Sequence, residues 1–145
     1  MADADPAPLG DIEAIKRLKA RYFRFLDARQ WDDWAMVFTE DAVLELPEAD
    51  SVTQGRSDVV AAVSAADEGA RTVHQGFMPE IELTGPDTAT GIWAMCDYVE
   101  WPANEDGSRV GINGYGHYHE EYRRDDCEWR IARTRHMRLR VDPIS

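Results

Sequence analysis

DIEAIKRLKARYFRFLD, residues Asp11–Asp27, is the stretch that decides the fold. Its apolar residues recur every three to four positions, which places them on one face of a helix packed against a core. This apolar set is Ile12, Ile15, Leu18, Tyr22 and Leu26. The basic residues between them, Lys19 included, are expected to face solvent. Gly10 and Asp11 supply the expected N-cap, and the helix is expected to end at Asp27.

Beyond this helix the chain changes from short helices to long strands. A second helix is expected over residues 31–38, a turn over 39–41, a short strand over 42–46, a polar loop over 47–55 with a brief return strand at 51–54, and a third helix over 57–66. Long strands are expected over 72–83, 88–101, 110–124 and 129–141. Helices followed by antiparallel strands predict an α+β fold. A strongly curved antiparallel sheet wrapped around the N-terminal helices would leave a pocket between them. Residues 11–145 form the expected single domain, after a disordered lead-in over 1–10.

Composition narrows the possible partners and the location of the protein. The 145 residues carry a net charge of −12, which argues against nucleic acid or an anionic membrane as a partner. The two cysteines, Cys96 and Cys127, lack metal-ligand spacing and are too few for a disulfide framework. The start of the sequence has neither the basic nor the apolar region of a signal peptide. A cytoplasmic protein is therefore expected.

The strand over 88–101 carries the clearest functional signal. Asp97 shares its strand parity with Trp93 and Met95, so all three are expected to point toward the apolar side. A carboxylate there must be paired, hydrogen-bonded or protonated, because bare burial costs several kcal/mol. Two interpretations stay open for Asp97, a salt bridge to one of the five arginines in 129–140 or a catalytic role.

His74 is the candidate general base. A lone strand histidine is more often structural, and becomes a base only when a carboxylate orients it, for which Asp27 is the candidate. Tyr22 is either a core residue or a hydrogen-bond donor to a developing enolate oxygen. Five residues at about 100° each place Tyr22 and Asp27 about 140° apart on a regular helix. Both face one pocket only if the helix loosens near Asp27 or the sheet wraps far around it.

A second cluster of candidates lies near the C-terminus. His117 and His119 fall on one side of a strand, and His136 falls on its neighbour. The three could form a metal site, but their spacing fixes no third ligand. Histidines that are solvent-exposed or hydrogen-bonded are the simpler interpretation, and no metal is expected. The arginines of 129–140 are expected to form a solvated face, from which one could turn inward to bind a carbonyl or an anion.

Three stretches resemble the SnoaL-like branch of the nuclear transport factor 2-like (NTF2-like) superfamily, and within it the bile acid 7α-dehydratase family. They are residues 11–27, the His74 strand running on to Asp97, and GINGYGHYHEEY (111–122) with WRIARTRHMRLR (129–140). The resemblance implies a cone-shaped α+β barrel, elimination without metal or cofactor, and a homotrimer, or a dimer as in other branches. It also implies a pocket formed by Tyr22, Asp27, His74, Asp97 and Arg138. Scytalone dehydratases and hexachlorocyclohexane dehydrochlorinases are similar in using an Asp–His pair, which matches Asp27 and His74.

The expected function is a cofactor-independent hydro-lyase (dehydratase) acting on a hydrophobic polycyclic substrate, steroid-like or aromatic. His74, oriented by Asp27, would remove a proton, Tyr22 would hydrogen-bond the enolate, and Asp97 would protonate the departing hydroxyl. Arg138 would anchor a polar end of the substrate or hold Asp97, and Trp93 and Met95 would contact the substrate. Two alternatives remain open, a ketosteroid-isomerase-like or cyclase-like enzyme with the same base, and a non-catalytic binding protein.

Overall fold

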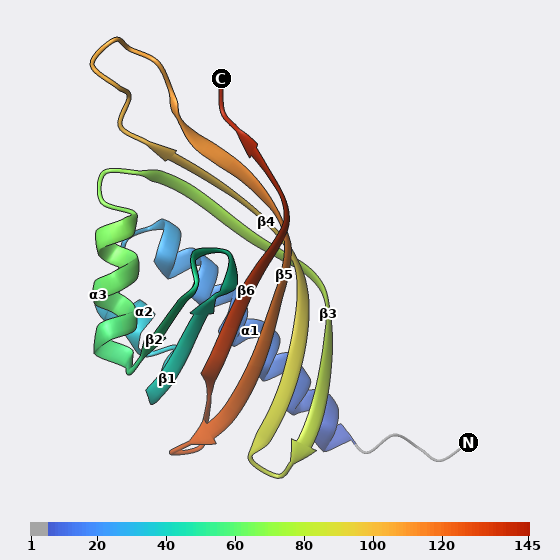
Figure 1. Ribbon diagram of the computed structural model, residues 1–145. Coiled ribbons are helices and arrows are strands. Elements are labelled where there is room, and N and C mark those ends of the chain that lie inside the picture. Colours follow the sequence, from blue (N-terminus) through green and yellow to red (C-terminus); the bar gives the residue numbers. More distant parts are fainter. Residues whose placement is uncertain (1–5) are drawn as a thin grey trace.

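The computed structural model describes residues 6–145. Its helices and strands follow in the order α1 (Pro6–Asp27), α2 (Trp31–Ala35), β1 (Phe38–Leu46), a 3₁₀ turn (Pro47–Ala49), β2 (Ser51–Gln54), α3 (Arg56–Ala66), β3 (Arg71–Gly85), β4 (Thr88–Trp101), β5 (Val110–Asp125) and β6 (Glu128–Pro143). In Figure 1 the long strands form one curved sheet that wraps over α1, while α2 and α3 lie on the same side as β1 and β2. The observed fold is therefore the predicted α+β arrangement.

The six strands form a single sheet in the order β2-β1-β6-β5-β4-β3. All neighbouring strands run antiparallel except β1 and β6, which are parallel. The sheet is thus mixed, and the expectation of a wholly antiparallel sheet is wrong at this one pair. One edge of β1 pairs with β6, the last strand of the chain, and not with a strand next to it in the sequence. The local sequence pattern does not indicate in which direction such a distant strand runs.

Helix α1 begins at Pro6, so Gly10 and Asp11 lie inside the helix and not at its N-cap. Proline suits the first helical turn, because its fixed φ is helical and the amides there have no partner within the helix. Residues 6–10 therefore correct the expected lead-in, and residues 1–5 lie outside the described part of the chain. Asp11 accepts hydrogen bonds from Arg124 Nη1 at 2.8 Å and from Trp129 Nε1 at 3.1 Å.

The core lies between α1 and the concave face of the sheet. Ile15, Leu18, Tyr22 and Leu26 are buried as the helical spacing predicted. Lys19 corrects the sequence interpretation, because its side chain is fully buried and not solvated. The cause is a partner far along the chain: Lys19 Nζ lies 2.8 Å from Glu120 Oε2 on β5.

The segment 31–46 departs from its expected pattern. α2 is a single short helix, and Phe38, expected at its end, is the first residue of β1. The expected turn at 39–41 is part of that strand, where the pairing of β1 with β6 shifts register between Phe38 and Val43. Such an irregularity lets a polar, turn-like triplet sit inside a strand. Thr39, within it, is fully buried.

The remaining elements agree with the sequence predictions. α3 and the four long strands begin and end within two residues of the expected positions, and β2 occupies the expected 51–54. The alternation on β4 is confirmed, since Trp93, Met95, Asp97 and Val99 are all buried. In the described part of the chain, none of the helices combines the length and the apolar character that crossing a membrane requires.

Candidate active site

A cavity of about 390 Å³ lies between the C-terminal half of α1 and the sheet, closed on one side by α3 and β2. This volume falls within the range of about 300–1,000 Å³ typical of small-molecule sites. Most of the lining is apolar, with Leu26, Leu44, Val63 and Ile112 among the contributors. The ionisable side chains in the wall are Tyr22, Asp67, His74, Tyr118, His136 and Arg138, and Ser51 and Thr53 of β2 add two hydroxyl groups. The cavity thus combines an apolar interior with a few convergent polar groups.

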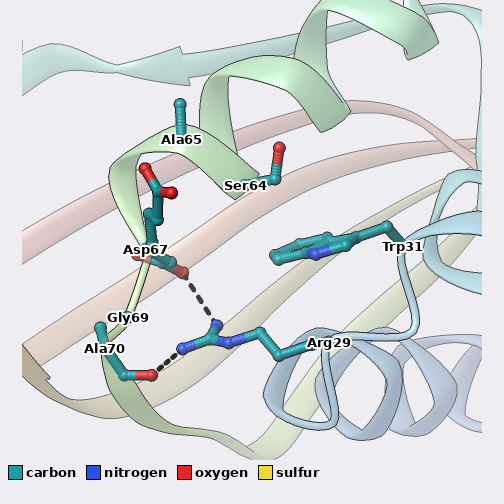
Figure 2. Close-up of a pocket in the computed structure, with 8 residues that line it drawn as sticks. Arg29, Trp31, Ser64, Ala65, Asp67, Gly69 and Ala70 are labelled. Atoms are coloured by element: carbon teal, nitrogen blue, oxygen red, sulfur yellow. Dashed lines mark hydrogen bonds and ion pairs between the residues drawn. The ribbon is translucent and has the colours of Figure 1, made fainter.

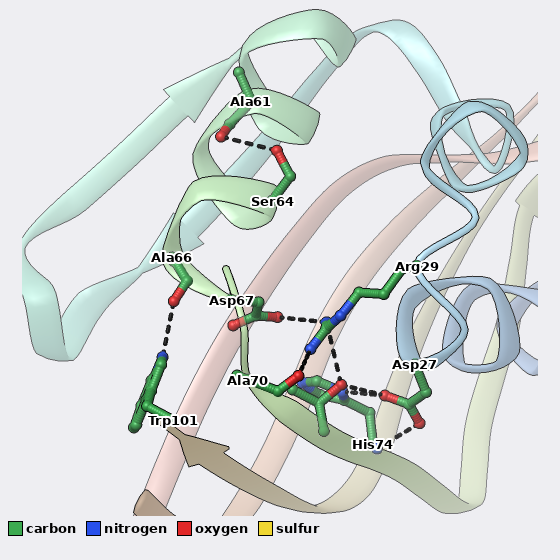
Figure 3. Close-up of polar contacts among 10 residues, drawn as sticks. Asp27, Arg29, Ala61, Ser64, Ala66, Asp67, Ala70, His74 and Trp101 are labelled. Atoms are coloured by element: carbon green, nitrogen blue, oxygen red, sulfur yellow. Dashed lines mark hydrogen bonds and ion pairs between the residues drawn. The ribbon is translucent and has the colours of Figure 1, made fainter. Parts of the chain in front are cut away.

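Asp27 and His74 meet at one edge of this cavity, as Figure 3 shows. His74 Nδ1 lies 2.7 Å from Asp27 Oδ1, and the His74 backbone N–H donates to Asp27 Oδ2 at 2.9 Å. Thr72 Oγ1 also donates to Asp27 Oδ1 at 3.0 Å. The carboxylate can only accept, so in the neutral imidazole Nδ1 carries the proton and Nε2 keeps its lone pair. An imidazole held in this tautomer is equipped to act as a general base.

The predicted 140° conflict between Tyr22 and Asp27 has a geometric solution. Asp27 is the last residue of α1 and lies behind His74, so its side chain contacts the imidazole without lining the cavity. Tyr22, five residues earlier on α1, lines the cavity directly. The helix does not need to loosen, because β3 brings His74 between the carboxylate and the cavity.

Tyr22 belongs to a buried aromatic cluster. Its ring meets Tyr118 edge to face at 6.0 Å between centroids, and Lys19 Nζ lies 3.7 Å from each of these two ring centroids. Burial raises the pKa of Tyr22, and the Glu120 carboxylate adds to the increase. The Tyr118 hydroxyl acts in the opposite direction through a loose contact that falls outside hydrogen-bond geometry. Tyr22 therefore faces the cavity as a neutral phenol.

Asp97 is paired with Arg138, the one arginine of 129–140 that turns into the cavity wall. Arg138 Nη2 donates to Asp97 Oδ2 at 2.5 Å and Arg138 Nε donates to Asp97 Oδ1 at 3.3 Å. The Asp97 side chain is fully inaccessible and does not line the cavity. Of the two interpretations left open by the sequence, the salt bridge to an arginine of 129–140 describes the geometry of Asp97. Gly114 makes room for the pair, since a Cβ there would come within 2.1 Å of Asp97 Oδ1.

Trp93 and Met95 do not reach the cavity. Both are buried on the expected face of β4, but they pack in the core below it. Trp93 Nε1 donates to the Tyr122 hydroxyl at 2.8 Å, which ties its indole to β5. The expectation that these two residues contact a substrate in the cavity is corrected accordingly, because strand parity identifies the inner face without saying which part of that face is hollow.

Asp67 is a cavity residue that the sequence interpretation missed. It follows the last residue of α3, and its side chain is 12% exposed. Its one ion-pair partner among the described residues, Arg29, is loose, with Nη1 3.7 Å from Oδ2. Burial raises the pKa of Asp67, while the charges of His74 and Arg29 oppose the increase. The available signal was a carboxylate at a helix C-terminus, where the helix dipole disfavours negative charge.

Asp67 also borders a second, more open cleft on the other side of Arg29, drawn in Figure 2. There Arg29 lies against Trp31 and binds the Ala70 carbonyl oxygen. Arg29 Nη1 is 3.4 Å from Thr72 Oγ1, so it connects Asp67 to the threonine that supports Asp27. The two carboxylates near His74 are therefore connected through Arg29 and Thr72 together.

The three C-terminal histidines are separated by the sheet. Alternation along β5 places His117 and His119 on the outer face, whereas His136 stacks on Tyr118 on the inner face. A shared metal site of these three residues is not compatible with this geometry. Among the described residues, no group of three or more candidate ligands is positioned to hold a metal ion. His136 instead lines the cavity, a position that sequence spacing did not identify.

Comparison with known proteins gives consistent matches over nearly the whole chain. The profile of the SnoaL-like domain family matches residues 7–135. A relative from Gibberella zeae, named "Probable cyclase FGR4", is 28% identical over 135 residues, which cover 86% of this chain and 89% of the relative.

Solved structures with the same fold include two named for elimination enzymes. A type 2 hexachlorocyclohexane dehydrochlorinase (LinA) is 20% identical with a TM-score of 0.84, covering 98% of this chain and 94% of the other. A protein of Novosphingobium aromaticivorans inferred to be a scytalone dehydratase is 18% identical with a TM-score of 0.84, covering 95% and 90% of the two chains. At these identities the structural likeness establishes the fold alone.

Proposed function

The chain belongs to the SnoaL-like domain family, and we propose that within it the protein is a carbon–oxygen lyase that needs no cofactor. The substrate is a hydrophobic polycyclic hydroxy-carbonyl compound, steroid-like or aromatic. The observation that carries the proposal is the Asp27–His74 pair at the edge of a largely apolar cavity. An oriented imidazole base and an apolar binding volume are the parts that proton abstraction beside a carbonyl requires.

The proposed reaction is an elimination. His74 Nε2 removes a proton from a carbon next to the carbonyl, and Asp27 stabilises the imidazolium that forms. Tyr22, a neutral phenol facing the cavity, donates a hydrogen bond to the enolate oxygen. The electron pair then forms a carbon–carbon double bond while the carbon–oxygen bond breaks. The departing hydroxyl takes a proton and leaves as water, and solvent returns the proton from His74 to the acid.

Asp67 is the proposed acid in place of Asp97. Asp67 lines the cavity, is loosely paired at 3.7 Å and has a raised pKa, whereas Asp97 is tightly paired and outside the lining. A carboxyl group that protonates a leaving hydroxyl must hold its proton near neutral pH and reach the substrate. Arg138, held in place by Asp97 behind it, then serves as a fixed polar part of the cavity wall.

The test is a substrate screen read by mass spectrometry. Hydroxy-ketosteroids and polyketide-like phenols are incubated with wild type, His74→Ala and Asp27→Asn, with His119→Ala as the matched control on the exposed outer face. Loss of water is expected for wild type and for the control. His74→Ala is expected to lower turnover about 10²–10⁴-fold, the usual contribution of one general base. Equal turnover by His74→Ala and wild type would refute the mechanism.

A cyclase is the second candidate, favoured by the 28% identical fungal relative named as a cyclase. The same base could generate an enolate that attacks a carbonyl within the same molecule. Cyclisation or isomerisation leaves the product mass unchanged, so the screen separates these reactions from dehydration. Binding without any product, insensitive to His74→Ala, would instead indicate a binding protein.

The expected homo-oligomer, a trimer or a dimer, remains a proposal. Leu139 and Val141 on β6 expose 76% and 46% of their surface, which suits a contact between copies of the chain. Sedimentation velocity of the wild type beside Leu139→Glu tests it, and a monomeric wild type would refute it.

A further inference from the structure

The inner wall of the cavity carries two polar groups that the described protein leaves unpaired. His136 on β6 and Tyr118 on β5 lie opposite each other in the sheet, and their rings stack with centroids 4.7 Å apart and planes 18° from parallel. His136 is 7% exposed and Tyr118 is 1% exposed, yet both line the cavity. Neither His136 Nε2 nor the Tyr118 hydroxyl has a hydrogen-bond partner among the described residues.

Such groups are costly unless something in the cavity pairs with them. A buried donor or acceptor left without a partner destabilises a protein, and most buried polar atoms are satisfied. Replacement by an apolar residue of similar shape would avoid the cost. Five buried side-chain atoms of the described residues lack a partner, and only those of Tyr118 and His136 belong to residues that line the cavity. Their shared position at the cavity favours a ligand as the missing partner.

The charges around His136 define what kind of ligand group fits. Burial, with the charge of Arg138 acting in the same direction and that of Asp97 in the opposite one, lowers the pKa of His136 to about 3. The charges of His74 and Lys19 also lower the pKa of His136. At neutral pH the imidazole is uncharged and offers one donor and one acceptor. Arg138 is already paired with Asp97 and Glu48, so the described residues of the wall offer no free cation to an anionic group.

We propose that Tyr118 and His136 form a subsite that hydrogen-bonds an uncharged oxygen of the substrate, a hydroxyl or carbonyl distinct from the groups that react at His74. This inference rests on the proposed function, which makes His74 the reacting end. β6 and β3 are separated by two strands, and His136 lies five residues along β6 from Val141, the residue in the same row of the sheet as His74, so the subsite and His74 occupy different parts of the cavity wall. The substrate class is thus a rigid ring system with an uncharged oxygen function near each end.

Binding measurements with matched probes test the subsite without any turnover. The probes are oestrone, which has an oxygen at each end of a four-ring skeleton, and its two analogues that each lack one of those oxygens. Wild type should bind oestrone more tightly than the analogue whose missing oxygen would meet His136. In His136→Phe, which keeps an aromatic ring in the stack, that preference should fall by about two- to tenfold, the range for one neutral hydrogen bond. Tyr118→Phe should behave in the same way.

Two controls separate the subsite from a structural role and from the catalytic proposal. His136→Phe should melt at the wild-type temperature or higher, because it removes an unpaired polar group, and His119→Phe on the outer face should leave all affinities unchanged. His74→Ala should keep the oestrone preference even though it lacks the base. If His136→Phe bound all three probes like wild type, or wild type did not bind oestrone, the subsite would be refuted. If the preference is as expected but no substrate turns over in any screen, the lyase fails and the subsite stands.

Discussion

Replacing Lys19 by methionine should destabilise the fold by about 3–5 kcal/mol, the usual cost of leaving one member of a buried ion pair unpaired. Lys19 Nζ lies 2.8 Å from Glu120 Oε2, and both side chains are fully inaccessible. The other carboxylate oxygen, Oε1, accepts from the Tyr122 hydroxyl at 2.9 Å. Without the ammonium, that single hydrogen bond must support a buried negative charge. Methionine keeps the length and the apolar stem of lysine, so the change isolates the loss of charge.

Thermal unfolding followed by circular dichroism measures the effect. At about 3 °C per kcal/mol for a domain of this size, Lys19→Met should lower the melting temperature by about 9–15 °C. Lys16→Met, an exposed lysine on the same helix, should stay within about 0.5 kcal/mol of wild type. The double variant Lys19→Met/Glu120→Gln removes both charges and should recover most of the loss. A single variant as stable as Lys16→Met, or a double variant as unstable as the single, would refute the reasoning.

Three further outcomes follow from other buried groups. The pKa of His136 is lowered from 6.5 to about 3 in the folded protein. Between these two pH values the unfolded chain binds a proton at His136 that the folded chain does not bind. The free energy of unfolding is therefore unaffected by protonation of His136 above pH 6.5 and decreases as the pH falls toward 3. Urea unfolding at pH 7.5 and 4.5 should show wild type losing about 2–3 kcal/mol more than His136→Phe. Arg138→Ala should cost about 3–5 kcal/mol because it leaves the Asp97 carboxylate buried and unpaired, and Arg138→Lys should cost less in the same unfolding assay. Gly114→Ala should lower the melting temperature, because its Cβ would lie within 2.6 Å of Arg138 Nε. Gly10→Ala is the matched control: it lies inside α1 with no atom within 4 Å of the added Cβ, and it should raise the free energy of unfolding by up to about 1 kcal/mol.

The spacing of apolar residues along the chain correctly predicted which faces of α1 and β4 lie in the core. The apolar spacing in α1 and the alternation in β4 each report a face directly, which is why Tyr22 and Asp97 were both assigned to the interior. Burial of Lys19 depends on Glu120, 101 residues away, and a helical pattern cannot reveal such a partner. The parallel pairing of β1 with β6 is non-local in the same way.

The residues of the candidate site show the same difference between local and long-range information. The family resemblance suggested that Asp27 and His74 could meet, and the structure brings them together. The sequence did not place His136 or Asp67 in the cavity, because the shape of the cavity depends on α1, α3 and the sheet together. The same limit explains Trp93 and Met95, which lie on the correct face but outside the hollow region.

The two carboxylates beside His74 share a position in their helices but not their surroundings, and this difference assigns their roles. Asp27 ends α1 and Asp67 follows α3, so each lies where the helix dipole disfavours a negative charge. Asp27 receives three hydrogen bonds, two from His74 and one from Thr72, which hold its carboxylate in one orientation. Within residues 6–145, the side chain of Asp67 has only the loose ion pair with Arg29 at 3.7 Å, so burial raises its pKa. One helix end therefore holds the group that orients a base, and the other holds a group suited to carry a proton.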